Sequence, residues 1–201
     1  MKTAGKSQPH KAPVLCNMFS ELLEGTTLEV ARRLIGCTLS YNAPEGVMAG
    51  IINETEAYTE EDPACHAYGG KQTRKNQTMF QESGHLYIYL IYGMYHCANL
   101  VTEEAGRGSA VLIRSVLPTE GVELMIQNRN YKEKNLKNLC NGPGKLCQAF
   151  NWNLSLDGLD LRKKNSKITL HPASSPPTKV IETPRIGITK GVELPWRFYS
   201  I

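Results

Sequence analysis

The sequence has no hydrophobic run long enough to cross a membrane. Its first residues, MKTAGKSQPHKAP, also lack the apolar segment that a secretory signal requires. We therefore expect no membrane association and no export, so the six cysteines, which include no CxxC pair, are expected to be reduced thiols. No internal repeat is visible, and 201 residues with a net charge of +4 fit one domain that tolerates a nucleic-acid partner without requiring one.

Several catalytic signatures are missing as well. The Ser, His and Asp residues show no arrangement typical of a hydrolase triad. The segment at 142–145, GPGK, precedes an expected helix but lacks the spacing of a P-loop, so nucleoside triphosphate binding is not expected. The pairs Cys65-His66 and His96-Cys97 would form a zinc site only if their strands met, and their spacing favours buried thiols instead.

The patterns that are present predict a mixed fold. The expected strands cover residues 37–42, 47–58, 85–92, 95–101 and 109–117, with short strands in the C-terminal third. The segment APEG at 43–46 is expected to join the first two strands as a hairpin turn. The expected helices start at a capping box at 26–29 and end at Gly36, and cover 119–127 and 144–150. We predict an α+β fold: a mobile tail at 1–14, then a single mixed domain at 15–201 with a curved, largely antiparallel β-sheet flanked by a few helices.

Aromatic residues are concentrated in one part of the chain. Residues 86–99 read LYIYLIYGMYHCAN, without Asp, Glu, Lys or Arg, and six of the nine tyrosines fall between Tyr58 and Tyr95. Stacking aromatics beside a shielded carboxylate would suit a flat substrate that is hydrolysed, whereas the alternative is that these tyrosines pack the core. Tyr89 and Tyr92, three residues apart, are expected on opposite sides of one strand, one stacking in a pocket and the other at the surface.

The segment ETEAY supplies the carboxylates. In a strand, Glu54, Glu56 and Tyr58 point the same way, so one carboxylate would be placed to take a proton from water if that face lines a cleft. A pair of surface glutamates on an edge strand is one alternative. A retaining glycosidase is another, because its two carboxyl groups stand about 5 Å apart.

Two further charged or titratable residues are candidates. Arg114 lies among apolar neighbours in AVLIRSV, so it needs an anionic partner, and either a structural salt bridge or a contact with a phosphate or carboxylate meets that need. His66 lies in the polar loop at 59–78, which is long enough to be functional. A structural role for His66 is the alternative.

A set of motifs occurs in one order: ETEAY with His66, GG-x-QT, LYIYLIYGMYHCAN, VLIRSV, LCNGPGKLCQA, and PRIGITKG followed by LPWRFY. Together they closely resemble the alkyladenine DNA glycosylase family, also called the 3-methyladenine DNA glycosylases. The resemblance runs from about Phe19 to Tyr199, and several long motifs in order are far more specific than one match. It implies a single mixed α/β domain with an antiparallel sheet that acts as a monomer and needs no metal or cofactor.

The resemblance also implies residue roles. Glu56 resembles the general base that activates the attacking water, and Arg114 a basic residue near that water and the phosphate of the flipped nucleotide. The residues that resemble the pocket for the flipped base are Tyr58, His66, Tyr89 and Asn99, the last of which crowds the exocyclic amino group of guanine. The residues expected to contact the rest of the DNA are Tyr92 and Met94, by intercalation, and Lys145 and Arg185, at the backbone.

The implied function is that of a monofunctional DNA glycosylase of base excision repair. It would bind double-stranded DNA and excise 3-methyladenine and 7-methylguanine, together with etheno purines or hypoxanthine, leaving an abasic site. Two alternatives stay open: a non-catalytic protein that binds damaged DNA, and a carbohydrate glycosidase that uses Glu54 and Glu56. The expected location is the cytoplasm, beside a bacterial chromosome, or the nucleus in a eukaryote.

Overall fold

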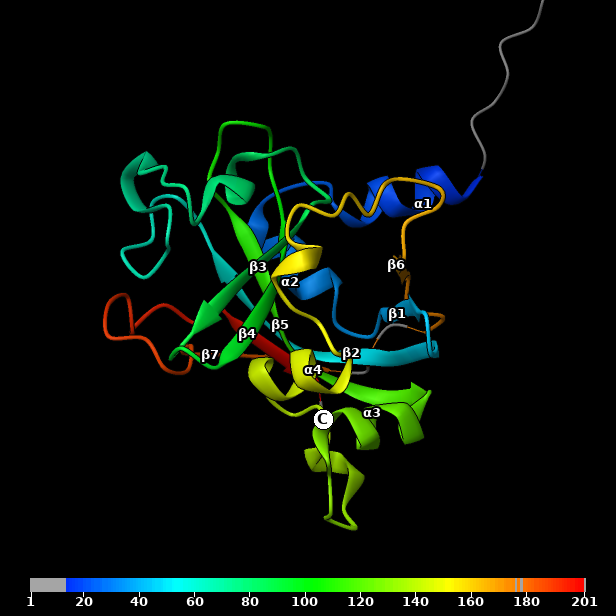
Figure 1. Ribbon diagram of the computed structural model, residues 1–201. Helices are drawn as coiled ribbons and strands as arrows, with labels where there is room; N and C mark the ends of the chain where they lie inside the picture. The colour runs from blue at the N-terminus through cyan, green and yellow to red at the C-terminus, as the bar shows by residue number, and fades with distance from the viewer. Residues whose placement is uncertain (1–13, 176, 178, 201) are drawn as a thin grey trace, which may run out of the picture.

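The computed structural model describes residues 14–175, 177 and 179–200. Its centre is a curved, eight-stranded antiparallel sheet in which β3, β4, β5, β2, β1 and β6 follow one another, and β8 pairs with β2 and β7. The strands are β1 (Thr38–Ala43), β2 (Gly46–Tyr58), β3 (Leu86–Ile91), β4 (Tyr95–Val101), β5 (Ala110–Glu120), β6 (Ile168–His171), β7 (Val180–Thr183) and β8 (Arg197–Ser200). This confirms the predicted single mixed domain with a curved antiparallel sheet and a few helices (Figure 1).

Four α-helices flank the sheet: α1 (Val14–Leu22), α2 (Thr27–Arg33), α3 (Val122–Arg129) and α4 (Pro143–Ala149). Short 3-10 turns lie at η1 (Tyr68–Gly70), η2 (Gln77–Phe80), η3 (Leu136–Asn138) and η4 (Leu154–Leu156). The helix α1 was not predicted. Of the predicted tail, residues 1–13 lie outside the described residues, and α1 begins at Val14.

Local sequence explains how the first elements form. The predicted capping box is present, because the Thr26 hydroxyl accepts from the Glu29 amide and the Glu29 carboxylate accepts from the Thr26 amide. After α2, Gly36 adopts φ +90° and donates its amide to the Ile52 carbonyl at 2.8 Å, which joins the end of the helix to β2. The predicted hairpin between β1 and β2 is also confirmed, with Ala43 paired to Gly46.

The predicted helix at 119–127 begins later than expected. Pro118 and Glu120 still pair with Gly50 and Ala49, so the sheet holds these residues in β5. Gly121, at φ +67°, then breaks the strand and α3 starts at the next residue. Pairing with β2 therefore overrides a local helical pattern here.

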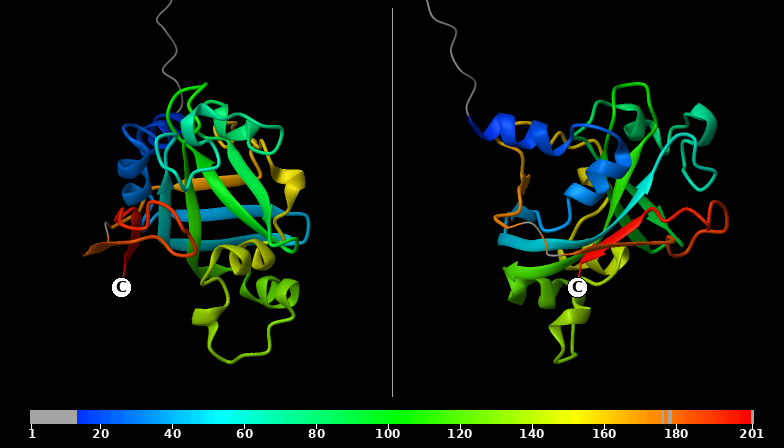
Figure 2. Two further views of the ribbon diagram at one scale, coloured as in Figure 1. Left: turned by 90° about the vertical axis from the view of Figure 1, so that its left-hand side faces the viewer. Right: turned by 180° about the vertical axis from the view of Figure 1, so that it is seen from behind.

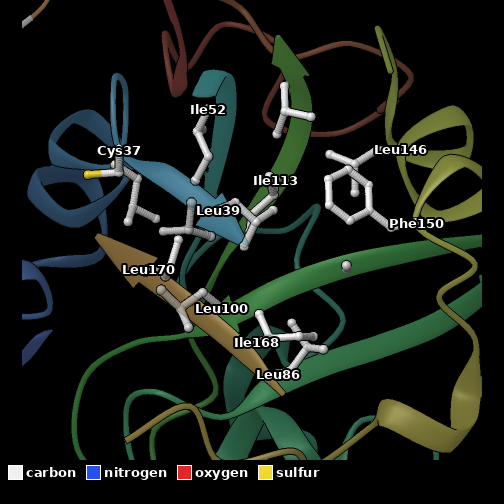
Figure 3. Close-up of a cluster of buried hydrophobic side chains, with 14 of the residues drawn as sticks. Cys37, Leu39, Ile52, Leu86, Leu100, Ile113, Leu146, Phe150, Ile168 and Leu170 are labelled. Carbon is white, nitrogen blue, oxygen red and sulfur yellow. The ribbon is translucent and has the colours of Figure 1, made fainter. Parts of the chain in front are cut away.

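The main core lies between the sheet and the helices. Figure 3 shows side chains from β1, β2, β4 and β5, among them Leu39, Ile52 and Ile113, gathered in one cluster with Leu146 of α4 and with Phe150, the residue that follows α4. These side chains are almost completely buried. Five cysteines have described side chains, and all five are free thiols, as predicted. Within the described part of the chain, no helix is long and apolar enough to cross a membrane.

Three segments reach one side of the molecule and build the site. They are the loop after β2 at 59–80, the β3–β4 hairpin and the loop before β8 at 184–196 (Figure 1). Figure 2 (left) shows this side facing the viewer. Because β2 pairs with β5 on one side and with both β1 and β8 on the other, its C-terminal end lies at the centre of this arrangement.

Candidate active site

A cavity of about 520 Å³ opens on the side where these three segments meet. Its walls come from the loop after β2, the β3–β4 hairpin, β5, the start of α4 and residues 186–190. The predicted site residues that line it are Tyr58, His66, Tyr89, Tyr92, Asn99 and Arg114. The structure therefore brings together most of the residues that the sequence singled out.

The carboxylate of Glu56 lies directly behind the cavity wall and is fully buried. Its Oε2 accepts from the Tyr58 hydroxyl at 2.8 Å and from the Arg114 guanidinium at 3.2 Å. Its Oε1 accepts from the amide of Ile186 at 2.8 Å. All three donor residues line the cavity. A single layer of groups, each hydrogen-bonded to the Glu56 carboxylate, therefore lies between this carboxylate and the cavity.

Arg114 joins both glutamates of ETEAY. Its Nε donates to Glu54 Oε1 at 2.8 Å, and Arg197 donates to the same oxygen at 2.6 Å. Burial opposes the charge of Arg114, but Glu56 and Glu54 outweigh that effect and raise the pKa of the guanidinium. The anionic partners that Arg114 needs are thus Glu54 and Glu56, in structural salt bridges. The guanidinium keeps its charge at the cavity.

These contacts confirm that Glu54, Glu56 and Tyr58 point the same way. The interpretation of a surface pair on an edge strand is wrong, because β2 has paired strands on both sides and Glu56 is buried. Glu54 is absent from the cavity wall and is held between two arginines. Only one carboxylate of the pair is therefore adjacent to the cavity.

Aromatic rings form a large part of the cavity walls, which also hold Arg114 and Lys190. The rings of His66 and Tyr89 meet edge to face with centroids 4.5 Å apart, and His66 Nδ1 shares a hydrogen bond of 2.9 Å with the Tyr87 hydroxyl. Burial lowers the pKa of His66 and raises that of Tyr89. The pKa of Tyr58 is raised by burial and by the charge of Glu56, so its hydroxyl stays a donor to that carboxylate.

Tyr87 received no role from the sequence, although it lines the cavity. The signal that finds it is the two-residue period of β3, which places Tyr87 on the same face as Tyr89. Tyr87 pairs across the hairpin with Asn99, whose side-chain amide donates to the Tyr87 carbonyl at 3.1 Å. This contact fixes the orientation of the Asn99 amide, which is 4% exposed.

The tip of the β3–β4 hairpin carries the most exposed aromatic side chain of the region. Tyr92 is 77% exposed and Met94 is 65% exposed. The prediction that Tyr89 and Tyr92 lie on opposite sides of one strand is wrong, because β3 ends at Ile91 and Tyr92 sits in the turn at φ +54°. The expectation of one tyrosine in a pocket and the other at the surface still holds, since Tyr89 lies in the cavity wall while Tyr92 is exposed at the hairpin tip.

The two residues predicted to contact the DNA backbone, Lys145 and Arg185, differ in their exposure. Lys145 is exposed on α4, with its Nζ 2.7 Å from Asn141 Oδ1, and lies outside the cavity wall. Arg185 contradicts the expectation of a DNA-backbone contact, because its side chain is fully buried and paired with Asp62. A guanidinium enclosed in this way presents no charge to a phosphate.

The motif PRIGITKG proves to be a wall of the cavity. Residues 186–190 line it, including one lysine, Lys190. No role was assigned to this stretch from the sequence, although its glycines, Gly187 and Gly191, both adopt positive φ and indicate a shaped loop. Among the described residues, no group of three or more His, Cys, Asp or Glu is placed to hold a metal, so the zinc arrangement does not form.

Comparison with known proteins gives consistent results. The family model described as Methylpurine-DNA glycosylase (MPG) matches residues 21–201. A protein of Rubrobacter xylanophilus is 48% identical over 165 residues, which are 82% of this chain and 84% of the relative. Proteins of Francisella tularensis (40% identity, 91% of this chain and 94% of the relative) and Bacillus cytotoxicus (43%, 88% and 92%) are similar too. All three carry the name "Putative 3-methyladenine DNA glycosylase".

Proposed function

This chain belongs to the methylpurine-DNA glycosylase family, and we propose that it hydrolyses the N-glycosidic bond of alkylated purines in double-stranded DNA. The observation that carries the proposal is the position of Glu56. It is a single buried carboxylate, held by Arg114, Tyr58 and the Ile186 amide behind a cavity with aromatic walls.

The substrate base has to leave the duplex before it can enter this cavity. Extruding a nucleotide costs a few kcal/mol, and least for damaged pairs. Tyr92, which lines the cavity, and Met94 are exposed at the tip of the β3–β4 hairpin, and we propose that they occupy the gap that the base leaves. The positive φ of Tyr92 supports a functional reason for this exposed ring.

The cavity suits a flat and electron-poor base. Alkylation at ring nitrogen gives a purine positive charge, and the faces of Tyr58 and Tyr89 attract a cation. Asn99 lines the cavity with its amide held by the Tyr87 carbonyl, and its proposed role is to crowd the exocyclic amino group of guanine and so disfavour that base.

Hydrolysis follows from the groups behind the wall. In the DNA complex, a water donates to the remaining acceptor site of the Glu56 carboxylate, whose three donors stay in place, and the carboxylate accepts its proton as the water oxygen attacks the sugar carbon. The glycosidic bond breaks and its electron pair leaves with the base, which becomes neutral if it was cationic. A neutral lesion such as hypoxanthine takes up a proton from water as it leaves, so that it too departs as a neutral base. Arg114 stays charged between Glu54 and Glu56 and so holds the carboxylate in position.

The finer parts of this proposal concern substrates and assembly. We include 3-methyladenine and 7-methylguanine, and extend the range to etheno purines and hypoxanthine, because aromatic walls can stack on the flat face of a neutral purine as well as a charged one. The enzyme acts as a monomer, and Lys145 contacts the DNA backbone. The cytoplasmic location stays a prediction.

The alternative of a carbohydrate glycosidase has little structural support. A retaining enzyme needs two carboxyl groups that flank the bond, about 5 Å apart. The Oε1 of Glu54 instead accepts hydrogen bonds from Arg114 and Arg197, and Glu54 lies outside the cavity wall. The other alternative, a non-catalytic protein that binds damaged DNA, differs from our proposal because it predicts binding without hydrolysis.

The test is single-turnover excision from a duplex with one 7-methylguanine or ethenoadenine, followed by alkali. We expect strand cleavage only after alkali, which marks an abasic site left by water. Cleavage without alkali would contradict the monofunctional mechanism and point to an amine such as Lys190. Lesion binding that weakens steeply with salt but gives no product would favour the binder.

A further inference from the structure

The buried side chain of Arg185 is unusual in this fold. It and Asp62 form a two-pronged ion pair in which both side chains have no exposed surface. The guanidinium also donates to the carbonyl of Ala57 at 2.9 Å and to that of Gly191 at 3.3 Å. Its plane lies over two aromatic rings, 4.7 Å from the centroid of Tyr58 and 5.2 Å from that of Trp196.

These contacts join three separate segments. Ala57 is in β2, Asp62 is in the loop that follows it, and Gly191 is in the loop before β8. The first loop supplies His66 to one wall of the cavity, and the second supplies residues 186–190 to another. Asp62 also accepts from the Ala64 amide at 3.0 Å, which fixes the start of its loop. Arg185 therefore connects the two loops that enclose the cavity.

Arg185 also leads directly to the carboxylate. The next amide in the chain, that of Ile186, donates to Glu56 Oε1 at 2.8 Å. Because the guanidinium is held by Asp62 and two carbonyls, the backbone on either side of Arg185 has little freedom. The side chain itself does not line the cavity, so it acts only through its neighbours.

We propose that Arg185 is a positioning residue, which, through its pair with Asp62, aims the Ile186 amide at Glu56 and sets the distance between the two cavity loops. The inference rests on the proposed function. Stability alone is a weak reason for such a pair, since apolar replacements of buried ion pairs are often neutral. The pair instead fixes the positions of the two cavity loops, and small displacements of reacting groups lower a reaction rate strongly.

Two variants perturb the pair in different ways. Arg185→Lys keeps the positive charge but removes the two-pronged contact. Gly191→Ala keeps the pair and places a methyl group 3.0 Å from Asp62 Oδ1 and 3.2 Å from the Arg185 guanidinium, at a residue with φ +58°. An effect that both share comes from the geometry of the pair and not from loss of one particular group.

The experiment measures single-turnover excision at increasing enzyme concentration, together with hydrogen exchange of the peptide that contains Ile186. We expect the maximal rate to fall about tenfold or more in both variants, while the half-saturating concentration changes little. Exchange should rise in the segments around Asp62 and Ile186. The matched control is Met125→Ala, a fully buried substitution in α3 away from the cavity, which should leave the maximal rate of the folded protein unchanged.

The inference is overturned if Arg185→Lys and Gly191→Ala keep the wild-type maximal rate, or lose it only in proportion to the unfolded fraction, as the control does. A Glu56→Gln assay run alongside separates the two ideas. If that variant remains active, the proposed mechanism fails, and the exchange data still show whether Arg185 positions the Ile186 amide.

Discussion

The aliphatic core and the cavity wall are both buried, but they are built from different interactions. In the core, side chains such as Leu39 and Phe150 meet without polar partners (Figure 3). Behind the cavity, Glu56, Arg114 and Arg185 are buried and each is held by directed hydrogen bonds. Apolar packing is tolerant of small shifts and supplies stability, whereas the charged wall fixes particular atoms.

This contrast separates two kinds of substitution. Deleting a core side chain removes buried apolar area and leaves a cavity, so it acts on the free energy of unfolding. Removing a polar group at the cavity acts on the reaction, because the group contributes position and charge there. The expected outcomes below test whether the two regions are as separate as this account requires.

The largest effect on stability is expected for Leu39→Ala. Leu39 is completely buried on β1, and its truncation should lower the free energy of unfolding by about 2–5 kcal/mol. Urea unfolding measures the loss, and excision by the remaining folded protein should proceed at the wild-type rate. A large loss of rate in the folded fraction would show that core and cavity are coupled.

Tyr92→Ala should give the opposite pattern. The ring is 77% exposed, so the unfolding free energy should change by less than about 0.5 kcal/mol. Excision should lose stacking of about 1–3 kcal/mol, seen as a lower single-turnover rate at subsaturating enzyme. Leu154→Ala, at a leucine that is 53% exposed outside the cavity, is the control, and an equal effect there would argue against intercalation.

Tyr58→Phe keeps the ring and removes only the hydroxyl that donates to Glu56. We expect the maximal excision rate to fall by an amount equivalent to about 0.5–1.5 kcal/mol, with DNA affinity nearly unchanged. Tyr131→Phe removes a hydroxyl that donates to Glu133 and the Asn135 carbonyl, away from the cavity, and should have no effect on rate. A rate loss equal in both variants would contradict the role of the Tyr58 hydroxyl.

The smallest effect concerns pH. Burial lowers the pKa of His66 below its usual 6.5, so the unfolded chain takes up a proton in a pH range where the folded protein does not. The contribution of His66 to the free energy of unfolding should therefore be retained above pH 6.5 and decline as the pH falls toward the pKa of His66 in the folded protein. Unfolding curves at several pH values should show a steeper decline for the wild type than for His66→Gln, and parallel curves would refute this.

Much of the fold follows from local patterns. The capping box before α2, the hairpin between β1 and β2 and the limits of β4 all agree with the sequence, because each depends on neighbouring residues. The start of α3 does not, since the pairing of Pro118 and Glu120 with β2 is a tertiary contact that no local pattern shows.

The candidate site was likewise predicted where neighbouring residues determine it and missed where contacts between distant residues do. Alternation along a strand was enough to place Glu54, Glu56 and Tyr58 together. The burial of Arg185, which was expected at the DNA backbone, could not be predicted because its partner Asp62 is 123 residues away in the chain. Tyr92 was placed at the end of a strand because its own positive φ, +54°, is a property of the folded turn that the sequence does not show.

The most direct test of the central claim compares Glu56→Gln with Glu54→Gln in single-turnover excision at saturating enzyme. The account predicts that Glu56→Gln loses about 10²–10⁴-fold in rate while still binding the lesion, whereas Glu54→Gln, whose side chain contacts only the arginines, loses much less. Excision by Glu56→Gln at the wild-type rate would contradict the assignment of Glu56 as the general base.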